Sequence, residues 1–381
     1  MNTRRFYTSE SVSEGHPDKV CDQVSDALLD ECLKLDPNAR VAIETLVAKN
    51  LVVIAGEITL KDRQHPDFGA VARKVISEIG YTSRAIGIDA EFCDMMVSVV
   101  PQSPDIAQGV ETGGAGDQGM MFGMATNETE ELMPLPITIA HALMAESAKV
   151  RKADPSLGFR PDAKGQVTVV YEDGVPVAID TVVLSQQHEE DDQDRVRERV
   201  RAAIIDPVLQ RYSKYIKGDI KFHINPTGKF VEGGPESDTG LTGRKIIVDT
   251  YGGMCPHGGG AFSGKDPTKV DRSATYMARN VAKCIVAAGL ADRAQVALAY
   301  AIGVPEPVAI QVDTFGTEKI DLCELQERVD RVFRDRLTPA GIAKHLDLKR
   351  PIYRETAKNG HFGHLAFPWE DTKAAEELKQ K

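Results

Sequence analysis

The chain has 381 residues, of which 42% are hydrophobic and 27% charged, as is typical of a globular protein with an ample core and two or three domains. Its formal net charge of −11 argues against non-specific binding to nucleic acid or to an anionic membrane. The sequence shows no apolar run of roughly 20 residues, no signal peptide and no C-x-x-C among six scattered cysteines, so we expect a protein of the reducing cytoplasm without disulfides or zinc.

A helix is predicted at about residues 17–35, because apolar residues recur there at helical spacing. The polar stretch 13–18 leads into it, so His16 and Asp18 lie at its N-terminus, where free N–H groups and the helix dipole favour anions. Taken alone, the two residues also fit an ordinary turn followed by a first-turn charge.

Two apolar runs, 41–48 and 51–59, are separated by Lys49-Asn50 and predict a β-hairpin. Each run contains one carboxylate, Glu44 in the first and Glu57 in the second. A carboxylate in an otherwise apolar strand lies either on a solvated edge or at a functional site. The residues leave both interpretations open.

A helix at about 67–79 and a strand at 92–100 complete the first unit, and a polar loop at 101–112 follows. The loop is a candidate lid, with a plain connector as the alternative. The next residues, 113–119, contain the pattern G-x-G-x-x-G, but no strand leads directly into it, which argues against a dinucleotide-binding motif. We expect this backbone to pack against a ligand or another segment, with Asp117 as its one charged side chain.

The order helix, hairpin, helix recurs twice further along the chain. The predicted elements are helices at 135–152 and 191–209 with strands at 166–172 and 175–186, and then helices at 267–289 and 321–337 with strands at 294–302 and 306–314. The hairpins begin near residues 40, 166 and 294, a period of about 126 to 128 residues. We therefore predict an α+β protein of three similar domains, 1–101, 113–231 and 233–371, each an antiparallel sheet with helices on one face.

Residues 244–272 set glycines against charged side chains. A strand-like segment at 246–253 leads to a glycine run, and glycine lets backbone N–H groups turn toward an anion. Gly259-x-x-x-x-Gly264-Lys265 nearly matches the P-loop, but Asp266 stands where Ser or Thr coordinates the metal. Asp266-Pro267 is typical of a helix N-cap and its first turn. We interpret the stretch as a phosphate-binding loop other than a P-loop, with a glycine-rich surface turn as the alternative.

Isolated charged groups occur in several parts of the chain. They are His16, Lys164, Arg244, Lys245, Lys265 and Lys269 on the cationic or polar side, and Asp18, Asp117, Asp238 and Asp271 on the acidic side. A polyphosphate with Mg²⁺ explains them jointly, because neither set is easily buried without the other. Phe230 is a candidate to stack on a base, although a core position is the simpler explanation. The residues alone predict an enzyme acting on a nucleoside polyphosphate; the alternatives are a nucleotide-binding regulatory protein, a triphosphatase and a kinase.

Several longer strings resemble the S-adenosylmethionine synthetase (methionine adenosyltransferase) family. Gly114-Ala-Gly-Asp-Gln-Gly119 and His257-Gly-Gly-Gly-Ala-Phe-Ser-Gly-Lys-Asp266 are similar to the two signature motifs of that family. The other similar segments are 8–19, 160–164, 240–245, 247–253 and 269–273. The similarity extends from about residue 5 to residue 371.

The resemblance implies a pseudo-threefold fold, in agreement with the three predicted units. It implies a reaction in which the methionine sulfur attacks C5′ of ATP and displaces the triphosphate, which is then cut to pyrophosphate and phosphate. A displacement at carbon needs alignment and stabilisation of charge on the leaving group rather than a general base. The resemblance further implies a homodimer, often paired into tetramers, with each site built from both chains.

The resemblance also implies roles for individual residues. The triphosphate ligands and catalytic groups are His16, Lys164, Arg244, Lys245 and Lys265, and Asp117 faces the developing sulfonium. The other ATP-binding residues are Asp162, Lys229, Phe230, Asp238 and Ala261. The methionine-binding residues are Glu57, Gln102, Asp238 and Lys269. The metal ligands are Asp18 and Asp271 for Mg²⁺, with two ions expected per site, and Glu44 for K⁺.

Three features depart from the family pattern. The segment between Gln102 and Gly114 is shorter than in many members, where it gates the site. Lys229 stands where arginine is common, and Met124 replaces a common tyrosine.

Overall fold

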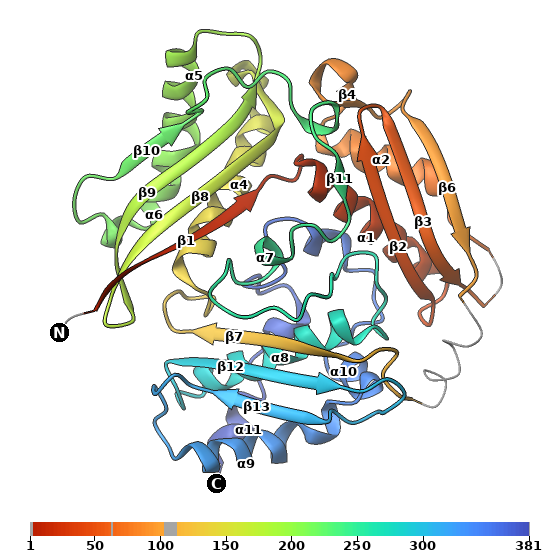
Figure 1. Ribbon diagram of the computed structural model, residues 1–381, viewed down its shortest axis with the longest axis vertical. Helices are drawn as coiled ribbons and strands as arrows, with labels where there is room; N and C mark the ends of the chain where they lie inside the picture. Colours follow the sequence, from red (N-terminus) through yellow and green to blue (C-terminus); the bar gives the residue numbers. More distant parts are fainter. Residues whose placement is uncertain (1–2, 62–63, 103–112, 381) are drawn as a thin grey trace.

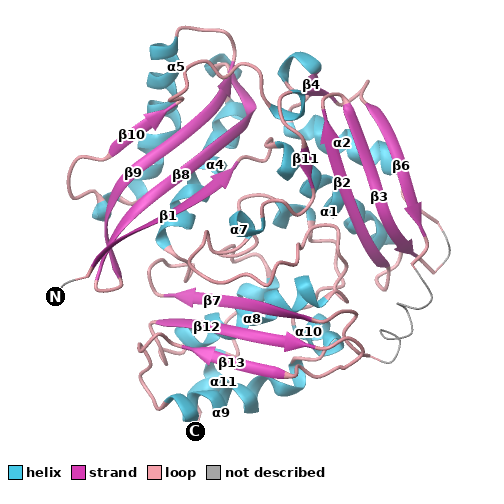
Figure 2. Ribbon diagram, viewed as in Figure 1, coloured by secondary structure: helices cyan, strands magenta, loops and turns pink. Residues whose placement is uncertain are grey.

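The structure is a computed structural model that describes residues 3–61, 64–102 and 113–380. Three β-sheets lie around a common centre, which is occupied by the short helix α7 (Ile246–Asp249) and the loops on either side of it (Figure 1). Helices cover one face of each sheet and leave the other face open (Figure 2). The three predicted hairpins are all present and antiparallel.

The first sheet is built on the hairpin that follows helix α1 (Pro17–Leu35). Its strands in spatial order are β11 (Gly240–Leu241), β2 (Arg40–Ala48), β3 (Leu51–Thr59) and β6 (Asp94–Val100). Helix α2 (Phe68–Ile79) joins β3 to β6, and β6 pairs with β3 in parallel. The sequence analysis predicted an antiparallel sheet; the parallel pair arises because the chain crosses over through α2 before it returns.

The central sheet repeats this arrangement. Its strands in spatial order are β1 (Arg4–Val12), β8 (Phe159–Glu172), β9 (Val175–His188) and β10 (Lys221–Ile224). The helices of this unit are α4 (Leu135–Ala153), α5 (Gln193–Val200) and α6 (Asp206–Arg211), with a π-helical turn at Arg201–Ile205 between the last two. β10 again pairs in parallel with the second strand of the hairpin.

The third sheet has three strands within the described residues. They are β13 (Ala309–Asp313), β12 (Arg293–Tyr300) and β7 (Gly119–Thr126). The helices of this unit are α8 (Val270–Ala287), α9 (Leu322–Phe333), α10 (Pro339–His345) and α11 (Ala375–Lys379). The remaining short strands are β4 (Thr82–Ser83) and β5 (Ile88–Asp89), which pair with each other in the first unit.

Each hairpin is completed by a strand from another third of the chain, where the N-terminal, central and C-terminal thirds are the predicted units 1–101, 113–231 and 233–371. β11 of the C-terminal third pairs with β2, β1 of the N-terminal third pairs with β8, and β7 of the central third pairs with β12. The exchange therefore runs in one direction around the molecule. None of the three sheets is assembled from its own third alone.

The edge of β2 that does not face β3 is paired with two separate segments of the C-terminal third. β11 and Thr242 bond to the half of β2 that contains Thr45, whereas residues 264–266 bond to the half that begins at Val41. The chain between these segments leaves the sheet as an excursion over 243–263. This excursion contains Arg244, Lys245 and the glycine run, so pairing with β2 fixes both of its ends.

Two local predictions in this region are wrong. The strand-like segment 246–253 contains helix α7, whose last residue, Asp249, forms a buried ion pair with Lys19 on α1. Helix α8 begins at Val270 with Lys269 as its N-cap, and not with Asp266 as the cap. The Asp266 carboxylate instead accepts hydrogen bonds from the N–H groups of Val41 and Thr268.

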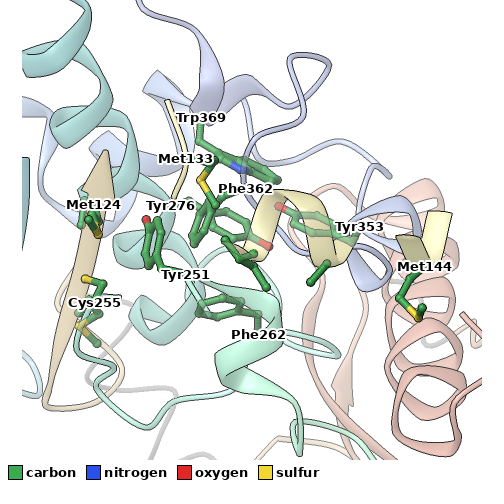
Figure 3. Close-up of a cluster of buried hydrophobic side chains, with 14 of the residues drawn as sticks. Met124, Met133, Met144, Tyr251, Cys255, Phe262, Tyr276, Tyr353, Phe362 and Trp369 are labelled. Atoms are coloured by element: carbon green, nitrogen blue, oxygen red, sulfur yellow. The ribbon is translucent and has the colours of Figure 1, made fainter. Parts of the chain in front are cut away.

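The core behind the glycine run is aromatic (Figure 3). Tyr276 on α8 stacks on Trp369, with ring centroids 3.8 Å apart, and Tyr251 stacks on Phe362 at 5.0 Å. Phe262 packs edge-on against Tyr276 at 5.6 Å. Tyr251 before the glycine run and Phe262 after it are therefore packed against the C-terminal tail and α8, which fixes both ends of the run.

Candidate functional site

A first cluster of charged groups lies at the N-terminus of α1. His16 is the N-cap, and its Nδ1 accepts a hydrogen bond of 3.2 Å from the Asp18 N–H. The Asp18 carboxylate is fully buried and receives Lys245 Nζ at 2.5 Å and Arg244 Nε at 3.1 Å. The Leu241 N–H donates to the same carboxylate. The structure thus brings together four of the residues predicted for the triphosphate and its metal.

His16 is a neutral ligand in this cluster. Burial, together with the charge of Lys245, lowers the pKa of His16 to about 3. The imidazole therefore carries no charge near pH 7, so it can offer a ligand a hydrogen bond but not an ion pair.

Beneath this cluster lies a buried ion network that the sequence analysis missed. Lys19 Nζ lies 2.9 Å from Asp22 and 2.5 Å from Asp249, and all three side chains are buried. Burial and the neighbouring Asp249 raise the pKa of Asp22 to about 7, although Lys19 opposes the shift. Charged residues in a helix are usually taken for a solvated face, and only the three-residue spacing of Lys19 and Asp22 along α1 indicated that these two side chains could meet.

Asp162 and Lys164 lie near this first cluster on β8. Lys164 is close enough to lower the pKa of His16 electrostatically. The Asp162 carboxylate accepts the Gly234 N–H at 2.9 Å through Oδ2, while its buried Oδ1 has no partner among the described residues. Burial raises the pKa of Asp162 to about 6, and the nearby carboxylate of Asp238 adds to the shift. A buried acceptor without a donor is an expected position for a ligand group.

A second cluster lies at the other end of the excursion. Lys265 Nζ lies 2.7 Å from the Asp271 carboxylate, and Lys269 Nζ lies 2.7 Å from that of Asp266. Together with Gln102 and Asp117, the two lysines and Asp271 line a cavity of about 170 Å³. The predicted methionine-side residues Gln102, Lys269 and Asp117 are thereby placed beside a predicted triphosphate lysine.

Close backbone approaches position both signature loops. A Cβ on Gly260 would overlap the Asp271 carboxylate, so only glycine fits between the loop and helix α8. A Cβ on Gly114 would overlap the carbonyl of Gly303. The expectation that the residues around Gly114 pack against another backbone segment is therefore confirmed. At the start of the excursion, a Cβ on Gly243 would lie 2.5 Å from that of Ala261, which places the predicted ATP-binding Ala261 beside Arg244.

Glu44 and Glu57 lie on the outer face of the first sheet. Both side chains are exposed, and Glu57 lies opposite Ala42, two residues from Glu44 on the same face. Partial burial and the charge of Glu57 raise the pKa of Glu44, and Lys265 opposes the shift. Lys265 pairs with Ala42 across the sheet edge, so its side chain lies on this outer face too. The second cluster and the two glutamates therefore share one side of the sheet.

Lys229 and Phe230 are not brought into either cluster. Lys229 is exposed and forms an ion pair with Glu190. The Phe230 N–H donates to His188 Nε2 at 3.1 Å, and its ring contacts the backbone at Gly233. Within the described residues, no hydrogen bond or ion pair joins these two side chains to the clusters. The candidate lid at 103–112 lies outside the described residues.

Three domain families match the chain in sequence order. They are the S-adenosylmethionine synthetase N-terminal domain at residues 4–104, the central domain at 112–230 and the C-terminal domain at 232–371. The chain is also 54% identical over 389 aligned residues to a protein of Treponema denticola named S-adenosylmethionine synthase, covering 100% of this chain and 99% of that protein. The chain belongs to the S-adenosylmethionine synthetase family.

Membership of the S-adenosylmethionine synthetase family confirms the predicted family, the predicted synthetase activity and the three-domain α+β fold. It also decides between the enzyme and the regulatory protein that the residues alone left open. Among the described residues, no helix is both long enough and apolar enough to cross a bilayer.

Proposed function

We propose that the two clusters form the opposite walls of one synthetase site, in which the methionine sulfur attacks C5′ of ATP and the displaced triphosphate is then hydrolysed. The observation that carries the proposal is the pairing of candidate triphosphate cations with buried or half-buried carboxylates. Arg244 and Lys245 are paired with Asp18, and Lys265 is paired with Asp271. The ion pairs hold these cations in fixed positions, which preorganises them for a bound anion.

The residues of the chain supply what this displacement needs. Arg244, Lys245 and Lys265 carry fixed positive charge to the leaving triphosphate, and neutral His16 donates a hydrogen bond to it. No side chain has to take a proton from the methionine sulfur. The exposed carboxylate of Asp117, which lines the cavity with Lys269, places negative charge where the sulfonium develops. Binding energy spent on the triphosphate therefore lowers the barrier at the far end of the nucleotide.

Asp18 and Asp271 would hold Mg²⁺, two ions per site, and their surroundings fit that role. Each carboxylate already attracts cationic side chains. Among the described residues no three His, Cys, Asp or Glu side chains converge on one point, which suits a metal bound by one carboxylate and by substrate phosphates. When bound, Mg²⁺ supplies Lewis-acid stabilisation of charge on the phosphate oxygens.

Glu44 would contribute to a K⁺ site. Its pKa is raised by burial and by the neighbouring Glu57, so the pair holds excess negative charge that a monovalent cation relieves. Glu57, Gln102, Lys269 and Asp238 would bind methionine. Asp162, Asp238, Lys229, Phe230 and Ala261 would bind the nucleoside part of ATP.

We propose further that the protein is a homo-oligomer whose sites are shared between two chains. The first cluster belongs to α1, whose Ser25 bonds to Thr45 on the inner face of the first sheet, whereas Lys265 and Glu44 lie on the outer face. The outer faces also expose apolar side chains, with Phe6, Met96 and Met120 each more than half exposed. A second chain against these faces would cover them and bring its first cluster to the second cluster of its neighbour.

The domain boundaries 1–101, 113–231 and 233–371 and a cytoplasmic location complete the proposal. The matched ranges of the three domain families support the boundaries. Six cysteines without a disulfide support a reducing compartment.

The test is an assay with ATP, methionine, Mg²⁺ and K⁺, in which S-adenosylmethionine, pyrophosphate and phosphate are measured together. We expect equal amounts of the three products, loss of turnover when Mg²⁺ is chelated, and a lower rate when Na⁺ replaces K⁺. Folded protein that makes no S-adenosylmethionine in the complete mixture would refute the proposal.

A further inference from the structure

Helix α1 carries four buried aspartates at four-residue spacing. They are Asp18, Asp22, Asp26 and Asp30. This spacing places them along one face of the helix. Each carboxylate accepts at least one backbone N–H from the C-terminal third of the chain: Leu241 for the first, Gly243 and Gly264 for the next two, and Tyr353 with Arg354 for the last. We call this row the aspartate ladder.

We call the proposed triphosphate cations Arg244, Lys245 and Lys265, together with Asp271, the cradle. The two middle aspartates each hold the residue that precedes a cation of the cradle. Asp22 Oδ1 accepts the Gly243 N–H at 2.9 Å, and Arg244 and Lys245 follow. Asp26 Oδ1 accepts the Gly264 N–H at 2.9 Å, and Lys265 follows. The same contact therefore occurs twice, one helical turn apart on α1.

Both bound residues are glycines in the left-handed region, at φ +80° for Gly243 and +81° for Gly264. A side chain is disfavoured there, and each glycine also approaches a neighbour closely, Ala261 in one case and Ile43 in the other. The backbone direction at each turn is set by the glycine and its contact with an aspartate. That direction decides where the following cation points.

Asp26 also holds the start of α8. Arg272 Nη1 and Nη2 donate to its two oxygens at 2.6 and 2.9 Å, and both side chains are buried. Arg272 follows Asp271, the candidate Mg²⁺ ligand. One carboxylate thus ties Lys265 and Asp271 to the helix whose first turn contains His16 and Asp18.

We propose that Asp22 and Asp26 are positioning residues, which hold the Arg244–Lys245 pair and the Lys265–Asp271 pair in register with the N-terminus of α1. Neither aspartate touches the substrate. The inference rests on the proposed role of these pairs at the triphosphate. It extends that proposal from the residues that contact the anion to the helix that positions each pair.

Asp22 is the better aspartate to remove, because its loss leaves Lys19 paired with Asp249 and creates no unpaired buried charge. Loss of Asp26 would leave Arg272 buried without a charge partner. Asp22→Ala removes the acceptor for the Gly243 N–H. Asp22→Asn keeps an oxygen in the same place and serves as the conservative rescue.

Asp30→Ala is the matched control. Asp30 belongs to the same ladder and accepts two N–H groups, but the loop that it holds contains no residue of the cradle. All three variants are first compared by circular dichroism melting, and kinetic constants are normalised to folded protein.

For Asp22→Ala we expect kcat to fall about 100-fold, as for a displacement of a catalytic group by roughly 1 Å, with tripolyphosphate hydrolysis falling in parallel and KM for methionine unchanged. We expect kcat within about threefold of wild type for Asp22→Asn and an unchanged kcat for Asp30→Ala. The inference is overturned if Asp22→Ala retains wild-type kcat, or if Asp30→Ala loses as much. Wild-type protein that makes no product would instead count against the proposed function, so the two failures are distinguishable.

Discussion

At the scale of single residues, Asp162 lies in an environment that disfavours its charged form. Its carboxyl is buried, one of its oxygens has no hydrogen-bond partner in the part of the chain that the structure describes, and its pKa is raised from 3.8 to about 6. The folded state therefore binds a proton more tightly than the unfolded state. This contribution to stability is complete below pH 3.8 and is lost as pH rises through 6, so near neutral pH the charged carboxylate costs stability.

Asp162→Asn should accordingly stabilise the protein and weaken ATP binding. The difference of about two pKa units corresponds to about 3 kcal/mol at pH 8 and to roughly half of that at pH 5. Denaturant unfolding at the two pH values measures the gain, and KM for ATP measures the loss. A variant that is less stable than wild type at pH 8 would contradict the burial argument.

Asp271→Ala should abolish turnover and leave the fold intact. Its ion pair with Lys265 is about one-quarter exposed, so its loss costs about 1 kcal/mol or less. We expect kcat to fall about 100-fold or more, because Mg²⁺ loses a proposed ligand and the negative charge on the leaving triphosphate is then stabilised less well.

The control for Asp271→Ala is Asp292→Ala, which breaks an exposed ion pair of 2.6 Å with Lys319 far from the clusters. Equal melting temperatures and unequal kcat values are expected. A wild-type rate in Asp271→Ala would remove the metal assignment.

The residues that we propose as substrate ligands were easier to predict than those that hold them. Lys265 and Arg244 lie in glycine-rich loops of an acidic chain, where isolated cations indicate an anion. Asp22, Asp26 and Asp249 lie within helices, and nothing in their spacing distinguishes a buried ladder from a solvated face. Only the tertiary contacts with Gly243, Gly264 and Lys19 give them a role.

At the scale of elements, the long helices and the hairpins were predictable because their apolar periodicity is strong. Helix α4 and strand β9 agree closely with the predicted ranges, whereas β8 begins seven residues before the predicted strand at 166–172. β1 was missed because its buried positions include Ser9 and Ser11, whose hydroxyl groups are satisfied by distant partners. A strand with so little apolar patterning is defined by the edge of β8 to which it pairs.

The fit between the glycine run and α8 gives an element-scale prediction. Gly260→Ala places a methyl group against Asp271, so either the loop or the first turn of the helix has to move. We expect kcat to fall about tenfold or more with little change in KM for methionine.

The control is Gly289→Ala just past the other end of the same helix, where φ is +73° and an added Cβ would lie more than 4 Å from every described atom outside its own chain neighbours. That substitution should lower stability by about 1 kcal/mol without changing kcat. If both variants keep wild-type kcat, the contact with Asp271 has no catalytic consequence.

At the scale of the whole molecule, the periodic hairpins predicted three similar units, but not how they are joined. A hairpin signal is local, whereas the exchange of β1, β7 and β11 between units depends on pairing across more than 100 residues. The division of the charged residues between two faces of the first sheet was also beyond sequence patterns, because it follows from how two distant segments pair with the same edge of β2.

Shared sites give a whole-molecule prediction by complementation. Asp18→Ala disables the first cluster and Asp271→Ala the second. When the two inactive chains are co-expressed, half of the dimers are mixed, and each mixed dimer has one site without a defect. Activity should return to about a quarter of wild type. No recovery, in dimers shown to be mixed by mass spectrometry, would mean that each site is built from one chain.

The one-way exchange of strands also has a consequence for synthesis on the ribosome. The β2–β3 hairpin emerges early, but the segments that cover the edge of β2 lie about 200 residues further along the chain. β7 likewise has no partner strand until β12 has been made. A nascent chain therefore carries open strand edges until residues 293–300 have been made, and during that time those edges are exposed to pairing with other chains.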